Sequence, residues 1–390
     1  MIITILVFLL LLSVLVLIHE AGHFFVAKKF GIKVEEFGFG FPPRMFSYKR
    51  GETIYSLNWL PIGGFVKLYG EDEAGGGKIR ISKSEIRNDK DRAFFARTAW
   101  QRALVLVAGV VMNAVLAVVI FYIFLGISGF KTDLPLLSDY KFFGVNQTNT
   151  QEVVISAIAK NSPAEKQGLK STTKVIAVNG WKITDTKKFI DIVNLNKGKE
   201  IEITWSSLQT NDVHKTKITP RLSPPKSEGA LGIGLFSMST AALNYATPIQ
   251  KIFSGITHPI NLMAYNLNVM AKLVQISLEK KTTEPLSQGL SGPVGIASIT
   301  GSILEIQNLK EKILQLLNLA GILSISLAFF NALPIPALDG GRLFFILIEA
   351  TIGRKVNQRF EAVTHTVGMI ILLTLMALIT FKDIIKLFVK

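Results

Sequence analysis

The sequence contains no cysteine in its 390 residues. Disulfides and thiolate metal sites are therefore excluded, and any bound metal ion needs His, Asp or Glu as its ligands. Acidic residues are scarce as well, since 28 Asp and Glu stand against 43 Lys and Arg, which gives a formal net charge of +15. No nucleic-acid-binding motif accompanies this charge, and 49% of the residues are hydrophobic. This composition predicts an integral membrane protein whose partners include the lipid bilayer and no nucleic acid.

Four apolar runs are long enough to cross a bilayer, which takes about 20 helical residues. They predict transmembrane helices at residues 1–30, 101–128, 311–345 and 362–388. A further apolar stretch, Ala242 to Gln275, is interrupted by His258, Pro259 and several Asn. These polar positions favour an amphipathic helix on the membrane surface over a fifth span. We therefore expect residues 226–278 to form an amphipathic region.

Basic residues predict the orientation of the helices. The segment from Lys28 to Arg102 carries 15 Lys and Arg, and Arg342 to Arg359 is basic too. Because cytoplasmic loops are enriched in Lys and Arg, we expect both segments inside the cell, including a cytoplasmic segment at 71–100. Both chain ends and residues 131–312 are then extracytoplasmic. The predicted fold class is a polytopic α-helical membrane protein with four transmembrane helices.

The first apolar run contains three ionisable groups, which are expensive inside a membrane. His19, Glu20 and His23 match the pattern H-E-x-x-H. Residues at i and i+4 share one face of a helix, so the two His can bind one zinc ion with the Glu beside them. The alternative is a polar pair that bridges helices in a bundle, but polar packing does not require this trio at this spacing. We therefore predict one zinc ion per chain.

A catalytic zinc ion commonly has three protein ligands and one open position. The third apolar run offers Asp339, which is followed by two Gly and preceded by Pro334 and Pro336. The prolines interrupt the helix, and broken backbone at membrane depth is tolerated only where protein or a water-filled cavity satisfies it. Alone, Leu-Asp-Gly-Gly would indicate a helix-ending turn in a cytoplasmic loop. With His19 and His23 in the same chain, we predict Asp339 as the third ligand.

Three segments, LIHEAGHF, LSGPVGIA and NALPIPALDGG, resemble motifs of the site-2 protease family of intramembrane zinc metalloproteases. More narrowly, the chain resembles the bacterial regulator-of-sigma-E protease branch, and the similarity covers nearly the whole sequence. Arg342 stands where many relatives have His, but this position is not a ligand position. The resemblance implies a catalytic base at Glu20, zinc ligands at His19, His23 and Asp339, and a substrate-binding residue at Asn331.

Two further features concern the substrate. Residues 36–70 alternate around a turn at Lys49 to Glu52 and predict a β-hairpin. An ordinary cytoplasmic hairpin and a membrane-associated hairpin that offers a strand edge to substrate both fit this pattern, and the resemblance favours the second. We assign Asn331, Pro334 and Pro336 to substrate binding, although an Asn that bridges two helices is equally ordinary.

Residues 150–222 resemble a PDZ domain, which is an α+β module. The similar segments are Ser162 to Ala164, Gly168 to Leu169 and Val178 to Gly180, with a helix expected from about Lys187 to Leu195. The pair Thr172 and Thr173 departs from the family's usual Gly-Asp. PDZ domains bind peptides by strand addition, so we expect an extracytoplasmic peptide ligand. A steric cap that gates access without any ligand is the alternative.

The resemblance implies hydrolysis of peptide bonds within transmembrane segments of single-span membrane proteins, in the bacterial cytoplasmic (inner) membrane. The substrate class is either a membrane-anchored anti-sigma factor or a remnant signal peptide. A catalytically inactive scaffold with a PDZ domain would keep the helices but would not need Glu20 between two ligand His. A metal transporter would also use intramembrane His and Asp, but the chain shows no internal repeat. We interpret His214, His258 and His365 as ordinary interface or surface residues.

Overall fold

The computed structural model describes residues 2–71, 90–171, 173–207, 213–225, 228–354 and 356–388. The chain divides into two compact units. Unit 1 comprises Met1–Ser128 and Ile252–Lys390, and unit 2 comprises Gly129–Lys251. Most of the expected cytoplasmic segment at 71–100, and Thr172 of the expected PDZ domain, lie outside the described residues.

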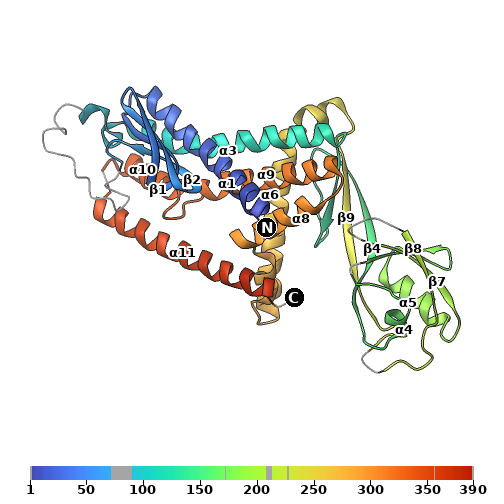
Figure 1. Cartoon of the computed structure of the whole chain (residues 1–390). Coiled ribbons are helices and arrows are strands. Elements are labelled where there is room, and N and C mark those ends of the chain that lie inside the picture. Colours follow the sequence, from blue (N-terminus) through green and yellow to red (C-terminus); the bar gives the residue numbers. More distant parts are fainter. Residues whose placement is uncertain are drawn as a thin grey trace. The chain divides into compact units, whose positions relative to one another are not determined.

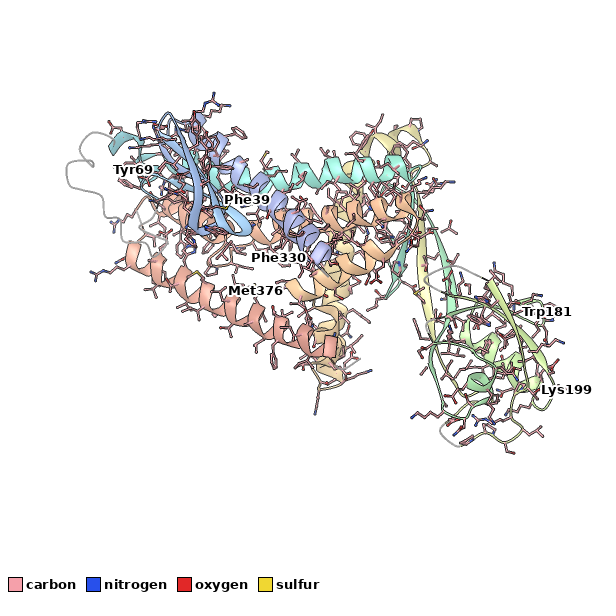
Figure 2. All side chains as sticks on the ribbon, viewed as in Figure 1. Phe39, Tyr69, Trp181, Lys199, Phe330 and Met376 are labelled. Carbon is pink, nitrogen blue, oxygen red and sulfur yellow. The ribbon has the colours of Figure 1, made fainter. Side chains whose placement is uncertain are left out.

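Unit 1 is built around long apolar helices (Figure 1). Among the described residues, four helices are long and apolar enough to cross a membrane, in agreement with the four apolar runs. Figure 2 shows side chains such as Phe330 and Met376 on two of these helices, and both remain exposed in the isolated chain, at 51% and 46%. Apolar side chains in this position are expected to face lipid. The four helices are α1 (Ile2–Lys29), α3 (Ala99–Ile127), α9 (Leu309–Ala332) and α11 (Gln358–Phe388).

The third apolar run differs from the expected single helix at 311–345. Helix α9 ends at Ala332, and a separate helix, α10, covers Asp339–Ile352. Pro334 and Pro336 cannot donate backbone hydrogen bonds and disfavour helical geometry in the residue before them. The intervening loop folds back on α10 so closely that a Cβ at Gly340 would lie 2.1 Å from the Leu333 carbonyl oxygen. Gly at this position therefore permits the sharp turn that places Asp339 at the start of α10.

Helices α1 and α3 pack against each other through small residues. A Cβ at Gly22 would lie 2.4 Å from the Ala108 carbonyl oxygen, so the two backbones are in close contact there. Helix α9 packs on α3 as well, and Gly321 of α9 faces the ring of Phe121 in α3. Such small residues let transmembrane helices approach each other closely. Helix α3 therefore contacts both α1 and α9.

A β-hairpin follows α1, as predicted for residues 36–70. It consists of β1 (Val34–Arg50) and β2 (Thr53–Leu68), which pair antiparallel up to the turn residues Arg50 and Thr53. Strand β2 also packs on α1, and Phe39 on β1 is marked in Figure 2. Glu52 in the turn is paired with Lys28 and Arg92. The hairpin is thereby tied to the end of α1.

The region at 226–278 was expected to be amphipathic, and the structure corrects this for its first part. Strand β9 (Ile233–Asn244) belongs to the sheet of unit 2, and helix α6 begins only at Pro248 and ends at Glu279. Helix α6 is not among the candidate membrane spans. His258 on α6 is fully buried beside Phe121 and Phe124, so it is not a surface residue. Unit 1 also contains the short helices η1 (Lys90–Arg92), η2 (Phe94–Ala96), α7 (Glu284–Gly289) and α8 (Pro293–Glu305).

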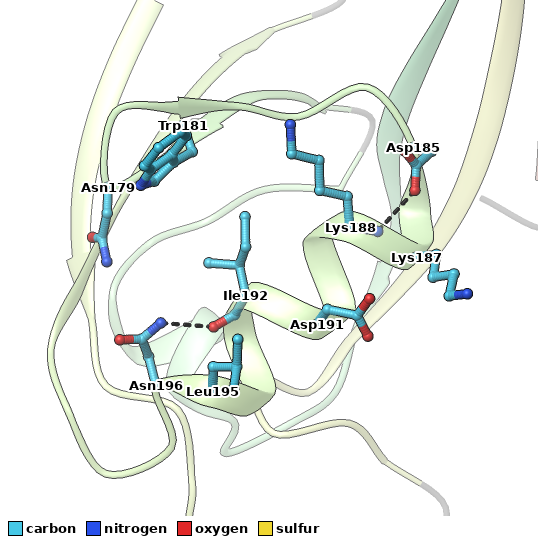
Figure 3. A pocket seen from close by; sticks show the side chains of 9 residues that line it. All are labelled: Asn179, Trp181, Asp185, Lys187, Lys188, Asp191, Ile192, Leu195 and Asn196. Atoms are coloured by element: carbon cyan, nitrogen blue, oxygen red, sulfur yellow. Dashed lines mark hydrogen bonds between the residues drawn. The ribbon is translucent and has the colours of Figure 1, made fainter.

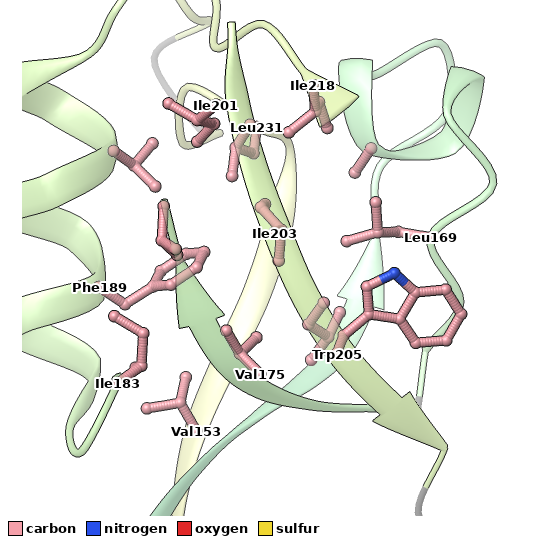
Figure 4. Packing of buried hydrophobic residues seen from close by; sticks show 14 of the residues in the cluster. Val153, Leu169, Val175, Ile183, Phe189, Ile201, Ile203, Trp205, Ile218 and Leu231 are labelled. Atoms are coloured by element: carbon pink, nitrogen blue, oxygen red, sulfur yellow. The ribbon is translucent and has the colours of Figure 1, made fainter. Parts of the chain in front are cut away.

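Unit 2 is a mixed α and β module whose sheet runs in the order β3-β9-β4-β5-β7-β8, with β6 paired to β5. Its core is a cluster of buried aliphatic side chains together with Phe189 of α5 and Trp205 of β7 (Figure 4). The helix expected from about Lys187 to Leu195 is α5 (Thr186–Leu195). The other elements are β3 (Lys131–Leu136), β4 (Asn146–Ile158), α4 (Pro163–Lys166), β5 (Thr173–Val178), β6 (Trp181–Lys182), β7 (Ile201–Ser207) and β8 (Val213–Ile218).

Candidate functional site

Two His of α1 and the first residue of α10 meet in unit 1. The Nε2 atom of His19 lies 2.8 Å from Oδ2 of Asp339, and the Nε2 atom of His23 lies 3.2 Å from the same oxygen. The two Nε2 atoms are 3.2 Å apart. His19 and His23 are buried, and His19 and Asp339 are 320 positions apart in the sequence. The three predicted ligand residues therefore converge on one point.

The donor set fits a zinc ion. Zinc takes His nitrogen and carboxylate oxygen at about 2.0–2.2 Å, and in a tetrahedron such ligand atoms are roughly 3.3–3.6 Å apart. The observed separations of 2.8 to 3.2 Å among the three ligand atoms are slightly shorter than this. A metal ion would thus need only a small outward movement of the side chains.

The second nitrogen of each His faces helix α3. Nδ1 of His23 donates a hydrogen bond of 2.8 Å to the carbonyl oxygen of Val105, which leaves Nε2 with a free lone pair. Nδ1 of His19 lies 3.4 Å from the side-chain nitrogen of Asn113. An acceptor at the second nitrogen, such as the Val105 carbonyl for His23, fixes the tautomer and the ring orientation of a metal-binding His.

Gly109 lies on α3 between these two contacts. A Cβ at this position would be 2.4 Å from Nε2 of His23 and 2.8 Å from Cε1 of His19. Both values are far below an ordinary carbon contact, so any side chain here would displace the imidazoles. Sequence reasoning missed Val105, Gly109 and Asn113. Their spacing of four residues places them on one face of α3, but this pattern alone does not show that the face meets α1.

Glu20 lies beside the ligands and contacts the hairpin. Its Oε2 accepts a hydrogen bond of 3.0 Å from the backbone N–H of Val66 in β2. This N–H points away from β1, because it bonds to a side chain of α1 instead of to the paired strand. Among the described residues β2 pairs only with β1, so the edge of β2 at Val66 faces the candidate catalytic carboxylate.

Two cavities are lined by residues of this centre. The first has a volume of about 210 Å³ and is lined by His19, Glu20, Asn113, Asn331 and Asp339 among others. The second has a volume of about 570 Å³ and lies between β2, α3 and the first turn of α10. Glu20 and Asp339 line both cavities. Both cavities thus give access to the same pair of carboxylates.

The remaining predicted substrate residues are placed differently. Asn331 lines the smaller cavity with His19 and Glu20, whereas neither Pro334 nor Pro336 lines either of the two cavities. Pro336 instead packs against α11, since a Cβ added at Gly368 of α11 would lie 2.5 Å from the Cβ of Pro336. His365 is buried rather than exposed, and its Nδ1 accepts a hydrogen bond of 2.8 Å from the N–H of Ala337. The loop before Asp339 is thus held by α11.

The site also contains one ion pair that the sequence did not predict. Arg342, one turn after Asp339, is paired with Glu71 at the end of the hairpin. Both side chains line the larger cavity. This contact joins the first turn of α10 to the segment that follows β2.

Unit 2 has a cavity of its own, with a volume of about 610 Å³, beside α5 (Figure 3). Trp181, Ile192 and Leu195 contribute its apolar part. Its polar residues make local contacts: Asp185 caps α5 by accepting from the Lys188 N–H, and Asn196 donates to the Ile192 carbonyl. These bonds serve the ends of α5, so this cavity does not repeat the chemistry of the centre in unit 1.

Comparison with known proteins identifies the family. The sequence model of peptidase family M50 matches residues 7–375 of the chain. The chain belongs to peptidase family M50. Its family relatives carry the description zinc metalloprotease, and this M50 chain is accordingly an intramembrane zinc metalloprotease of the site-2 type.

Several relatives match over almost their whole length. A protein of Clostridium perfringens described as a zinc metalloprotease is 34% identical over 377 residues, which are 97% of each chain. The zinc metalloprotease RasP of Bacillus licheniformis is 28% identical over 99% of each chain. The regulator of sigma-W protease RasP of Bacillus subtilis is also 28% identical over 99% of each chain.

Solved structures match the M50 chain, and one of them covers a part of it. It is the PDZ domain of the SdrC-like protein of Listeria monocytogenes, with 17% identity and a TM-score of 0.19. The match covers 25% of this chain and 93% of that domain.

Proposed function

We propose that His19, His23 and Asp339 hold the catalytic zinc ion of this protease and that Glu20 is its general base. One observation carries the proposal: the three ligand atoms are at most 3.2 Å apart, and Glu20 lines the same cavity as His19 and Asp339. The proposed substrates are single-span membrane proteins, which are cut within their transmembrane segments.

The chemistry requires a nucleophile, a base and a proton donor for the leaving group. Zinc, when bound, supplies Lewis acidity that lowers the pKa of a water molecule and polarises the scissile carbonyl. Glu20 takes the proton of the attacking water and returns it to the leaving amine. Its Oε2 already accepts from Val66, so this hydrogen bond fixes the carboxylate while the other oxygen is available to the water.

The free edge of β2 supports a role in substrate binding. A transmembrane helix has its carbonyl groups hydrogen-bonded, so a peptide bond must be unwound before it can be cut. An extended segment can pair with an exposed strand edge through main-chain hydrogen bonds. The N–H of Val66 is occupied by Glu20. A segment paired with the neighbouring main-chain groups of this β2 edge would therefore lie next to the proposed base. Asn331 would bind a freed backbone group from the other cavity.

Unit 2 has the features of a peptide-binding module. Strand β4 pairs with β9 from Asn146 to Ile158, but β3 pairs with β9 only from Ser239 onward. Within the part of the chain that the structure describes, the β9 edge from Ile233 to Met238 has no strand on that side, and α5 packs against β9. A peptide can add as a strand between this edge and α5. We propose that unit 2 is a PDZ domain that binds an extracytoplasmic peptide in this way.

The proposed cellular setting follows from the charges of the loops. We propose that the protein lies in the bacterial cytoplasmic membrane with both chain ends outside the cytoplasm, because its basic loops are expected in the cytoplasm. One of its relatives is named regulator of sigma-W protease. This name favours a membrane-anchored anti-sigma factor over a remnant signal peptide as the substrate class.

Metal analysis and cleavage of a single-span test substrate together test the proposal. The variants His19→Ala, His23→Ala and Asp339→Ala should lose zinc, since each removes one ligand. Glu20→Gln should keep zinc and lose cleavage, because this residue serves the water and not the ion. Full zinc content in Asp339→Ala would reject the third ligand. Equal cleavage by wild type and Glu20→Gln would reject the base, and absence of cleavage in both would favour an inactive scaffold.

A further inference from the structure

Asn113 of α3 stands out because its side-chain amide is fully buried and incompletely bonded. Its exposed fraction is 0%, and its Oδ1 has no hydrogen-bond partner among the described residues. Its Nδ2 lies 3.4 Å from Nδ1 of His19. A buried acceptor without a partner costs about 1–3 kcal/mol, so its occurrence at a candidate metal ligand needs a physical reason.

The tautomer of His19 supplies that reason. When His19 binds a metal ion through Nε2, its Nδ1 carries a hydrogen and can only donate. The amide nitrogen of Asn113 is also only a donor, so the two groups cannot bond as they stand. A rotation of the amide by 180° exchanges its nitrogen and oxygen. Oδ1 of Asn113 then accepts the hydrogen of His19, and the unpaired oxygen gains its partner.

We propose that Asn113 is a positioning residue of the metal centre, which accepts the Nδ1–H of His19 through its side-chain oxygen. The inference rests on the proposed role of His19 as a zinc ligand. Asn113 would hold the imidazole in the tautomer that leaves Nε2 free for the ion, just as the carbonyl of Val105 does for His23.

The geometry of α3 supports this pairing. Val105, Gly109 and Asn113 are spaced by four residues, and His19 and His23 have the same spacing on α1. The carbonyl of Val105 contacts His23, the side chain of Asn113 contacts His19, and Gly109 lies against both rings. One face of α3 therefore supports both His residues of the motif.

Asn113 is itself held in place by α9. The hydroxyl of Ser324 donates a hydrogen bond of 2.8 Å to the backbone carbonyl of Asn113. Both residues are fully buried. This bond ties the backbone at Asn113 to α9 and leaves its side-chain oxygen for His19.

The test measures the zinc affinity of the purified full-length protein by competition with a chelator. Asn113→Leu keeps the approximate size and removes the acceptor, so zinc should bind about 10- to 100-fold more weakly. Asn113→Asp keeps an acceptor in the same place and should stay within about threefold of wild type. The matched control is Asn331→Leu, the same change in the same cavity. Its zinc affinity should not change, because among the described residues the hydrogen-bond partners of the His19 and His23 nitrogens do not include Asn331.

A second readout separates positioning from a general loss of structure. The visible spectrum of the cobalt-substituted protein reports ligand geometry, and it should change in Asn113→Leu but not in Asn331→Leu. If Asn113→Leu does not fold, Asn113→Ala carries the same prediction. Wild-type zinc affinity in the folded variant, or equal weakening in Asn113→Asp, would overturn the inference. His19→Ala serves as the reference: if it keeps full zinc affinity, the proposed ligand set fails and not the role of Asn113 alone.

Discussion

Replacement of Gly109 by Ala should damage the metal centre through a single methyl group. The new Cβ would lie 2.4 Å from Nε2 of His23, where atoms in ordinary contact are at least about 3.4 Å apart. The imidazole or the helix must therefore move by roughly 1 Å. Metal sites require ligand distances within about 0.2 Å of their ideal values, so a displacement of this size is several times the tolerance.

The expected loss in zinc affinity is about 10- to 100-fold, which corresponds to roughly 1.4–2.7 kcal/mol. Overpacking should also lower the stability of the zinc-free protein by about 1–3 kcal/mol. The assay is chelator competition for zinc, combined with thermal unfolding of the zinc-free variants in detergent.

Two other Gly→Ala variants serve as controls. Gly126 lies in the same helix with nothing within 4 Å of its Cβ position, so Gly126→Ala should be neutral or slightly stabilising. Gly321→Ala places a Cβ 2.7 Å from the Phe121 ring and should destabilise the protein while it keeps zinc affinity. If Gly109→Ala binds zinc as tightly as wild type, the close contact between α3 and the imidazoles does not constrain the site, and the reasoning is refuted.

Three further predictions concern the hairpin, the topology and unit 2. Burial opposes ionisation of Glu52, but hydrogen bonds from Lys28 and Arg92 outweigh this effect and lower the pKa of Glu52. The ionised Glu52 therefore stabilises the folded protein above about pH 4.3, the pKa of an unfolded Glu, and this stabilisation is lost as the pH falls through the lowered pKa of the folded state. In thermal unfolding, wild type should therefore exceed Glu52→Gln at pH 7, and a difference that persisted unchanged below pH 3 would contradict this. Reporter fusions at Lys78 and Lys355 should give a cytoplasmic signal, and a cytoplasmic signal at Asn211 would show that the number of spans is wrong. Residues 129–251 can be replaced by a short linker, because Gly255 of α6 packs on Tyr122 of α3 and the two helices are in contact there. This variant should keep zinc binding and cleavage of a trimmed substrate, which has only a short extracytoplasmic tail, and should allow some cleavage of an untrimmed substrate with an intact extracytoplasmic domain. Loss of cleavage of the trimmed substrate with zinc retained would make unit 2 a required receptor.

The three candidate ligand residues could be brought together from the sequence because most of their pattern is local. His19 and His23 are four residues apart, so helix geometry alone brings them together, and only Asp339 required a long-range assumption. The contacts from α3 could not be predicted in this way. Gly109 and Asn113 belong to an ordinary apolar helix, and their role depends on which face of α3 meets α1, a property of packing and not of local pattern.

The largest error concerns β9, which was expected to belong to an amphipathic region. Its sequence is apolar enough for either structure, and its pairing partner β4 begins at Asn146, almost 90 residues earlier. Pairing between such distant segments leaves no mark on the hydrophobic pattern of either one. The expected PDZ domain at 150–222 therefore lacked the strand whose free edge is the proposed peptide site.

The position of Asp339 depends on a helix that contributes no ligand. The loop before Asp339 is held by α11, because Ala337 donates to His365 and Gly368 packs against Pro336. The other end of α11 is fixed as well, since Asp383 accepts hydrogen bonds from the N–H groups of Gly292 and Gly295 at the start of α8. Hydrogen bonds to a charged group contribute about 1.5–3 kcal/mol each, so this end of α11 is firmly attached. The segment containing Leu290 to Ala297 and the loop before Asp339 are therefore linked through α11, although they have no common ligand role.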